Sequence, residues 1–295
     1  PKEMSELLSQ EYQFKTLQVE EVQSSEKENT KKILFKTHDN RLIESVSMID
    51  KNLHTICISS QVGCSVDCQF CATGEMGFMR SLSCGEIIDQ FIEITKIREE
   101  PITNVVYMGM GEPFLNYNEV IKSAEILHDP HGMNLGRNRI TISTSGILPK
   151  IKQFIEEKQP YKLAISLNAA DDETRTRIMP INKKWNIQEL ITTLKNYPNL
   201  SNSERITFEY VMLRDVNDSL DDAKRLVKLI KNIPAKINLI PFNPWPGSKY
   251  QTSEPETVEI FSNFIKKAGY SSPVRRPRGV DIMAACGQLK SNSVK

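Results

Sequence analysis

The sequence has no long apolar run, no recognisable secretory signal and almost no net charge. No stretch of the 295 residues is apolar over the length that a bilayer requires, so we expect no membrane association. Lysine and arginine number 38 against 37 aspartates and glutamates, which leaves a net charge of +1. That balance argues neither for nor against nucleic-acid binding, so any RNA contact must rest on a local basic patch.

Cysteine is also scarce, with six in the whole chain. Three disulfides would suit a small secreted domain rather than a chain of 33.6 kDa without a recognisable signal. We therefore predict a reducing, cytoplasmic location and cysteines that bind metal or react. Because the sequence starts at Pro1 and not at Met, we expect it to be a fragment that lacks an N-terminal part.

Short β-branched runs alternate with amphipathic segments after residue 50. We predict strands at 55–60, 104–110, 139–146, 162–168, 206–213 and 236–242. Helices are predicted between and after them, for example at 219–233, where Ser219 can cap the first turn. Six strand–helix units indicate a parallel sheet, too small for an eight-stranded barrel. We predict an α/β fold, a partial (β/α)6 TIM-like barrel with its chemistry at the C-terminal strand ends.

The first fifty residues follow a different pattern. Residues 1–32 are polar and charged, and we expect helix or loop there. Residues 33–49 alternate like a small antiparallel hairpin that turns at 38–40. We therefore predict two regions, an N-terminal extension at 1–50 and a barrel core at 51–295 that includes a C-terminal loop.

The motif CSVDCQFC at 64–71 carries the strongest chemical signal. Its thiols, Cys64, Cys68 and Cys71, follow the first barrel strand with the spacing C-x3-C-x2-C. Three thiolates can bind three irons of a [4Fe–4S] cluster and leave one iron open to another ligand. The alternative is a zinc knuckle completed by Cys57 or His54. The full spacing directly after a first strand favours the cluster.

This loop resembles the signature of radical S-adenosylmethionine (SAM) enzymes. The resemblance implies that the open iron binds the methionine moiety of SAM and that one electron then cleaves the sulfonium to yield a 5′-deoxyadenosyl radical. The motif MGMGEP at 108–113 ends the second strand, where glycines let a ligand approach the backbone. It resembles the superfamily's methionine-amino site, which implies a cofactor role for Gly111 and Glu112.

Later strands also end in polar residues. Ser143 lies in STSG at the end of strand three, and the run Ser166, Leu167 and Asn168 ends strand four, where small polar groups could hold a ribose or a carboxylate. The loop NPWPG at 243–247 follows strand six. Its Asn243 could bond to an adenine edge. Trp245 could be a stacking platform or simply pack, and we favour packing.

Cys286 lies alone near the C-terminus. A lone cysteine is usually a small buried hydrophobe. Here Ala285 and Gly287 leave space around the sulfur, and the basic run at 275–278 can bind phosphate. Together these features suggest a thiol that is presented to a nucleic acid.

Seven motifs in order resemble the RlmN/Cfr family of radical SAM RNA methyltransferases, over nearly all of residues 3–290. They are the cysteine loop, MGMGEP, ISTSG, MPINKKWNI, EYVMLRDVND, INLIPFNPWPG and AACGQL. GEP at 111–113, NPWPG at 243–247 and the dipeptide at 278–279 resemble the branch that methylates C2 of an adenine. Its targets are 23S rRNA, in the peptidyl-transferase region, and the adenine beside the tRNA anticodon. A second branch, associated with antibiotic resistance, methylates C8 of the same rRNA adenine.

The resemblance implies a two-cysteine mechanism that consumes two SAM molecules per turnover. Cys286 takes a methyl group from the first SAM, and the second supplies the radical that activates this methyl for addition to C2. Cys57 then resolves the RNA adduct by forming a transient disulfide with Cys286, and Glu44 accepts the C2 proton. From its pattern alone, Glu44 would be an exposed hairpin carboxylate. Cys84 has no family role, and we expect it to be structural.

The resemblance also implies partners and shows departures. The partners are 23S rRNA, tRNA and a flavodoxin-type electron donor, and we expect a monomer. Asn168 stands where the family commonly has His, and Met283 where it has Asp. Family members carry a small helical RNA-binding domain before this region, most of which is absent from the sequence.

Two other functions compete with this one. One is a radical SAM maturase of another substrate class. Such maturases often carry a second cluster in the C-terminal part, but Cys286 is the one cysteine downstream of Cys84, and a single cysteine cannot hold a cluster. A zinc-stabilised RNA-binding protein is the non-enzymatic alternative.

Overall fold

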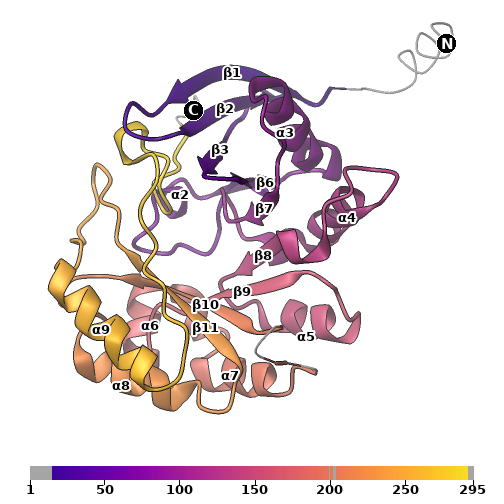
Figure 1. The fold of residues 1–295 in the computed structure, drawn as a ribbon. Coiled ribbons are helices and arrows are strands. Elements are labelled where there is room, and N and C mark those ends of the chain that lie inside the picture. Colours follow the sequence, from indigo (N-terminus) through magenta and orange to yellow (C-terminus); the bar gives the residue numbers. More distant parts are fainter. Residues whose placement is uncertain (1–14, 199, 202–203, 292–295) are drawn as a thin grey trace, which may run out of the picture.

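The computed structural model describes residues 15–198, 200–201 and 204–291 (Figure 1). Within these residues the main sheet has the strand order β1-β2-β3-β4-β7-β8-β9-β10-β11. Its last six strands are parallel neighbours: β4 (Leu53–Cys57), β7 (Asn104–Tyr107), β8 (Ile140–Thr144), β9 (Lys162–Ser166), β10 (Ile206–Met212) and β11 (Ala235–Pro241). They lie at the six predicted places, which confirms the partial (β/α)6 barrel.

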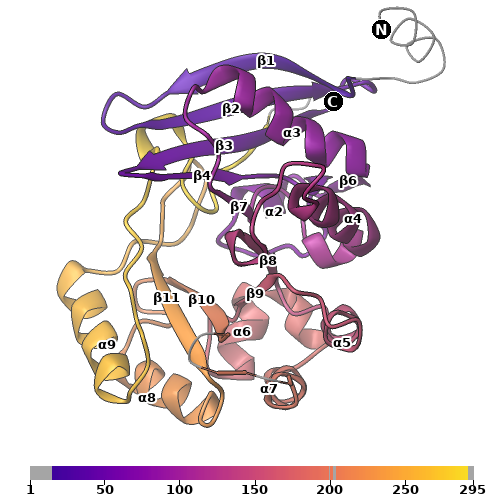
Figure 2. The same ribbon diagram turned by 45° about the vertical axis from the view of Figure 1, so that its right-hand side comes forward.

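Helices follow the strands and line the outside of the sheet (Figure 2). The predicted ones are α3 (Cys84–Ile97), α4 (Tyr117–His128), α5 (Leu148–Glu156), α7 (Ile187–Lys195), α8 (Leu220–Leu229) and α9 (Pro255–Lys267). As predicted, the side chain of Ser219 caps α8 by accepting from the backbone N–H of Asp222. Two short helices, α2 (Ala72–Glu75) and α6 (Asp172–Ile178), were not predicted, because neither is long enough to show a helical period. Four 3-10 turns complete the helical elements: η1 (Pro113–Asn116), η2 (Arg137–Arg139), η3 (Pro180–Lys183) and η4 (Val280–Ile282).

The N-terminal region contains one strand more than the predicted hairpin. β1 (Leu17–Ser24) pairs antiparallel with β2 (Thr30–Thr37), which pairs with β3 (Leu42–Asp50). The expectation of helix or loop is therefore wrong at 17–24, while residues 1–14 lie outside the described part. Leu17 is the one fully buried residue of β1, so this edge strand shows no apolar alternation, and pairing with β2 decides its structure. β3 in turn pairs with β4, so one sheet runs across residue 50.

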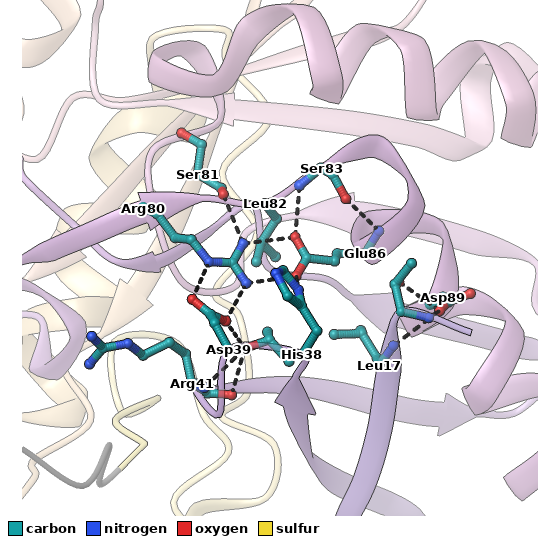
Figure 3. A network of polar contacts seen from close by, with 12 residues as sticks. Leu17, His38, Asp39, Arg41, Arg80, Ser81, Leu82, Ser83, Glu86 and Asp89 are labelled. Atoms are coloured by element: carbon teal, nitrogen blue, oxygen red, sulfur yellow. Dashed lines mark hydrogen bonds and ion pairs between the residues drawn. The ribbon is translucent and has the colours of Figure 1, made fainter. Parts of the chain in front are cut away.

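A polar network fastens the turn between β2 and β3 to the barrel (Figure 3). Arg80 lies on β6 (Phe78–Ser81), which forms a small hairpin with β5 (Gln61–Gly63). Its guanidinium donates to the carboxylates of both Asp39 and Glu86, and these bonds hold the pKa of Asp39 well below its usual range. Glu86 also accepts from the backbone N–H of Ser83 at the start of α3. The hairpin whose two strands flank the cysteine loop is therefore tied to both regions.

The C-terminal segment returns from α9 along β11 towards the N-terminal strands (Figures 1 and 2). Parallel bridges join Ser271 to Lys236 and Val274 to Leu239, so the segment extends the open edge of the barrel. Near its end the hydroxyl of Ser291 donates to the carbonyl of Leu42 on β3. The loop that carries Cys286 is thereby placed over the barrel mouth. No helix in the described part of the chain is long and apolar enough to cross a membrane.

Candidate active site

One pocket at the C-terminal strand ends brings together most of the predicted site residues. Those that line it are Cys57, Cys64, Cys68, Cys71, Gly111, Glu112, Ser143, Ser166, Asn168, Asn243 and Cys286. Leu167 is not among the lining residues, because its side chain is fully buried in the core. Glu44 also lies outside the lining, although Val46 and Met48 on the same strand belong to it.

The three-cysteine loop presents its thiols to backbone donors. The backbone N–H of Val66 favours the thiolate of Cys64, and those of Thr73 and Gly74 favour the thiolate of Cys71, so each lowers the pKa of its thiol. Burial nevertheless raises the pKa of the Cys64 thiol to about 12 and raises that of Cys71. Hydrogen bonds to sulfur are the contacts by which proteins tune iron–sulfur clusters. The thiol donor set and these N–H groups therefore fit a [4Fe–4S] cluster.

The zinc alternative does not fit the geometry. Both ring nitrogens of His54 are used inside the protein, Nε2 with the Ser47 hydroxyl at 2.8 Å and Nδ1 with the Glu100 carbonyl at 2.8 Å. Within the described residues, no group of three or more His, Cys, Asp or Glu side chains lies close enough to hold one metal ion. Thiolates that bind separate irons of a cluster stand further apart than the ligands of one zinc.

Glu112 forms a rigid carboxylate at the cysteine end of the pocket. Gly111 precedes it with a φ of 97°, and a Cβ there would lie 2.5 Å from the Cβ of Gln61, so glycine is required. The Glu112 carboxylate accepts from the backbone N–H groups of Phe114 at 3.0 Å and Ser145 at 2.7 Å. Burial raises the pKa of this carboxyl, while the two backbone donors oppose the shift. Such a group can accept a ligand ammonium.

Arg175 on α6 was missed by the sequence reasoning. It is fully buried, and its guanidinium donates to the carbonyls of Leu167 at 3.0 Å, Ser145 at 2.6 Å and Ser166 at 3.2 Å. Burial lowers its pKa to about 10, and the nearby Cys68 thiolate favours its charged form. Arg175 therefore fixes the ends of β8 and β9 behind the cysteine loop. An arginine on a short polar helix gave no sequence signal for this role.

Cys57 and Cys286 meet in the same pocket without forming a disulfide. Burial raises the pKa of each thiol to about 12, and the adjacent Cys286 thiolate adds to the shift of Cys57. The Arg275 guanidinium opposes both shifts. The Asn243 amide donates to the Cys286 carbonyl at 3.1 Å and so holds the loop in place. The two thiols therefore share one pocket, and the charge of Cys286 is felt at Cys57.

Glu44 is buried, so its interpretation as an exposed hairpin carboxylate is wrong. Only 4% of the residue is exposed, and its carboxylate pairs with Lys32 at 3.0 Å. It also accepts from the backbone N–H of Lys290 at 2.9 Å, four residues beyond Cys286. β3 is covered on this side by the C-terminal segment, a contact that local alternation cannot reveal.

Glu209 on β10 is a second buried carboxylate that the sequence reasoning missed. Its Oε1 accepts from the Asn238 amide at 2.8 Å and lies 3.3 Å from Nη2 of Arg275. Its Oε2 is buried and has no hydrogen-bond partner among the described residues. A glutamate within the otherwise apolar run ITFEYVM was the available signal.

Similarity to known proteins agrees with this geometry. The radical SAM superfamily signature matches residues 58–230. Proteins named dual-specificity RNA methyltransferase RlmN, from Parvibaculum lavamentivorans and Paracoccus denitrificans, are 53% and 50% identical over 86% and 90% of this chain. The chain spans 66% and 70% of their lengths, about two thirds.

The chain belongs to the RlmN family of radical SAM RNA methyltransferases.

A solved structure supports the same assignment. A radical SAM methyltransferase from Sphaerobacter thermophilus superposes with a TM-score of 0.94 at 39% identity, covering 98% of this chain and 86% of that one. Membership of the radical SAM family implies SAM and a [4Fe–4S] cluster as cofactors. In this RlmN-family chain, Cys64, Cys68 and Cys71 are the residues suited to hold the cluster.

The structure of this chain also shows the surroundings of Trp245 and Asn168. Trp245 is 6% exposed and donates to the Phe70 carbonyl at 3.2 Å, which confirms packing. Asn168 has a φ of 58°, and its side-chain oxygen accepts from the backbone N–H of Val211 at 2.8 Å. Its amide contacts the sulfur of Met179 at 3.1 Å, so this side chain is largely engaged within the protein.

The arginines at 275–278 line the pocket rim but differ in their contacts. Arg278 pairs with Glu28 at 3.0 Å and Asp50 at 2.6 Å, which ties the C-terminal segment to the N-terminal strands. Arg275 pairs with Glu209 and is 45% exposed. Of this basic run, Arg278 therefore has a structural role, whereas Arg275 remains accessible from the pocket.

Proposed function

We propose that this chain methylates C2 of an adenine in RNA, in the peptidyl-transferase region of 23S rRNA and beside the tRNA anticodon. The observation that carries the proposal is that Cys57 and Cys286 share one pocket with the three-cysteine loop. The relatives named dual-specificity RNA methyltransferase support the RNA substrate.

Cys286 is proposed to be the methyl carrier. Its sulfur attacks the methyl carbon of SAM, so that an S–CH3 bond forms, the sulfonium–CH3 bond breaks and S-adenosylhomocysteine leaves. Because its thiol is protonated at neutral pH, the proton must be lost first, and the neighbouring Arg275 guanidinium favours the thiolate. Exposure of Cys286 within the pocket leaves its sulfur open to both cofactor and RNA.

When bound, the cluster and a second SAM supply hydrogen-atom abstraction, which activates the methyl group on Cys286. Cys57 is proposed to release the methylated RNA by attacking the Cys286 sulfur, which leaves a disulfide that must be reduced. Glu44 is proposed to accept the C2 proton. Its carboxylate is held in place by the ion pair with Lys32 and by the backbone N–H of Lys290.

The cofactor residues are proposed from the family motifs and their place in the pocket. Glu112 would accept the ammonium of the SAM methionine moiety, with Gly111 giving the ligand access to the backbone. Leu167 would act through its backbone, because its side chain is fully buried. The other proposed SAM contacts are Ser143, Ser166, Asn168 and Asn243.

The proposed partners follow from the same family. They are 23S rRNA, tRNA and a flavodoxin-type electron donor, with two SAM molecules used per turnover. We propose a cytoplasmic monomer, divided into an N-terminal extension at 1–50 and a core at 51–295.

The test is mass spectrometry of the tryptic peptide that contains Cys286. The protein is reconstituted anaerobically with iron and sulfide and then incubated with SAM. The proposal predicts a methyl group on Cys286, absent in Cys286→Ala and retained in the control Cys84→Ala, whose thiol is buried at the start of α3. An unmodified Cys286 beside an intact cluster would contradict the two-cysteine mechanism.

A further inference from the structure

We propose that Glu209 recognises the target adenine, its Oε2 accepting a hydrogen bond from the exocyclic N6 amine. This inference rests on the proposed function and adds a specificity-determining residue to it. Glu209 lies on β10, lines the pocket and is 5% exposed.

The carboxylate of Glu209 is held at one oxygen and open at the other. Asn238 and Arg275 both contact Oε1, which fixes the plane of the group. Oε2 has no partner in the described part of the chain. A buried carboxylate oxygen without a donor is costly, and native proteins rarely leave one. An N–H or O–H of a ligand in the pocket would satisfy it.

The position of Glu209 favours the RNA base over the methionine end of SAM. Among the carboxylates and guanidinium groups, Glu209 and Arg275 act on Cys286, which also lies close to Cys71 of the cluster loop, whereas Glu112 and Arg175 act on Cys68 of that loop. Glu209 therefore lies on the side of the pocket that holds the methyl-carrying thiol. A base whose C2 reaches the Cys286 sulfur comes to lie beside this carboxylate.

Adenine offers a matching donor. Its N6 amine is attached to C6, and a single ring nitrogen, N1, separates C6 from C2. A carboxylate accepts from such an exocyclic amine, as it does from N4 of cytosine. Guanine and hypoxanthine carry a carbonyl oxygen at C6, which would face the carboxylate oxygen without a hydrogen between them. Glu209 would therefore select adenine against 6-oxopurines.

SAM also contains an adenosine, whose hydroxyls and amine are alternative donors. Ser166, a proposed SAM contact, is the register partner of Glu209 on the adjacent strand β9. The two sources separate experimentally, because methylation of Cys286 needs SAM but no RNA.

The experiment compares Glu209→Gln with the control Glu259→Gln, which changes an exposed glutamate on α9. Each protein is first S-methylated at Cys286 and then given an RNA stem-loop with either adenine or purine, which lacks the N6 amine, at the target position. Single-turnover rates are measured. The wild-type protein and Glu259→Gln should methylate the adenine RNA about tenfold or more faster than the purine RNA. This ratio corresponds to one hydrogen bond to a charged group. Glu209→Gln should lose this preference, because an amide presents a donor or a weaker acceptor to the amine.

Three results would overturn the inference. An equal preference for adenine over purine in Glu209→Gln and in the wild-type protein would show that Oε2 does not bind the amine. Failure of Glu209→Gln to become S-methylated with SAM alone would assign Oε2 to the cofactor. If the wild-type protein forms S-methyl-Cys286 but methylates neither RNA, the proposed RNA chemistry is contradicted. The proposed recognition of adenine is then contradicted as well.

Discussion

Glu112 and Glu209 are two buried glutamates on the wall of one pocket, and the protein uses their oxygens differently. Both oxygens of Glu112 accept from backbone N–H groups, so this carboxylate is fixed before any ligand arrives. Glu209 has one oxygen held by side chains and one without a partner among the described residues. The pocket thus has a carboxylate bonded at both oxygens beside the cysteine loop and a carboxylate bonded at one oxygen near Cys286.

This difference fits the proposed ligands. The end beside the cysteine loop would hold the same cofactors in every turnover, so rigid backbone contacts and the buried Arg175 behind them suit it. A target base must instead be distinguished from other bases. A hydrogen-bond acceptor that only the base satisfies binds it selectively, because an incorrect base leaves that acceptor unsatisfied.

The strongest test of the rigid end is Arg175→Met. It removes a buried guanidinium and leaves three backbone carbonyls without their donor, so we expect a loss of about 3–5 kcal/mol in the free energy of unfolding. Urea unfolding measures the loss. Arg177→Met on the exposed face of the same helix should change stability by less than about 0.5 kcal/mol. Similar stabilities for the two variants would show that the strand ends do not depend on Arg175.

The reactivity of Cys286 tests the environment between the two ends. Because burial raises its pKa to about 12, its thiolate is rare at pH 8, and its alkylation should increase about tenfold per pH unit up to pH 10. In a synthetic peptide of residues 280–291, the rate should instead level off near pH 9. Iodoacetamide labelling of iron-free protein, followed by peptide mapping, gives both curves. A plateau near pH 9 in the folded protein would contradict the raised pKa of this thiol in the pocket.

Glu112→Gln should have a moderate effect on both folding and cofactor binding. The amide can replace only one of the two acceptors of the backbone N–H groups, so we expect a loss of about 1–3 kcal/mol in unfolding free energy. The affinity of the reconstituted protein for SAM should fall by about tenfold or more, since the ammonium loses its carboxylate. Urea unfolding and equilibrium binding of SAM measure the two effects. Unchanged SAM affinity would exclude Glu112 from the ammonium site.

The smallest effect on stability is expected for Glu209→Gln. The amide oxygen can keep the bond from Asn238, and the ion pair to the half-exposed Arg275 contributes little. Unfolding free energy should therefore change by less than about 1 kcal/mol, below the change in Glu112→Gln. A larger loss of unfolding free energy in Glu209→Gln than in Glu112→Gln would contradict a more firmly bonded carboxylate at Glu112.

The sequence predicted the barrel and the cysteine loop because both are local patterns. Six β-branched runs lie where six parallel strands form, and Ser219 caps the helix that its spacing indicates. The C-x3-C-x2-C spacing is contained within eight consecutive residues, so it can be recognised without knowledge of the fold. Chain similarity to the RlmN family then extended the prediction to Cys57 and Cys286, which no local pattern connects.

Tertiary structure alone decided the features that join distant segments. β1 is a strand because β2 pairs with it, and Glu44 is buried because the C-terminal segment crosses β3. The sequence does not show that the carboxylate of Glu112 is bonded at both oxygens and that of Glu209 at only one. Their difference depends on which backbone N–H groups and side chains the fold brings within hydrogen-bond distance, and that is set by packing between elements far apart in the chain.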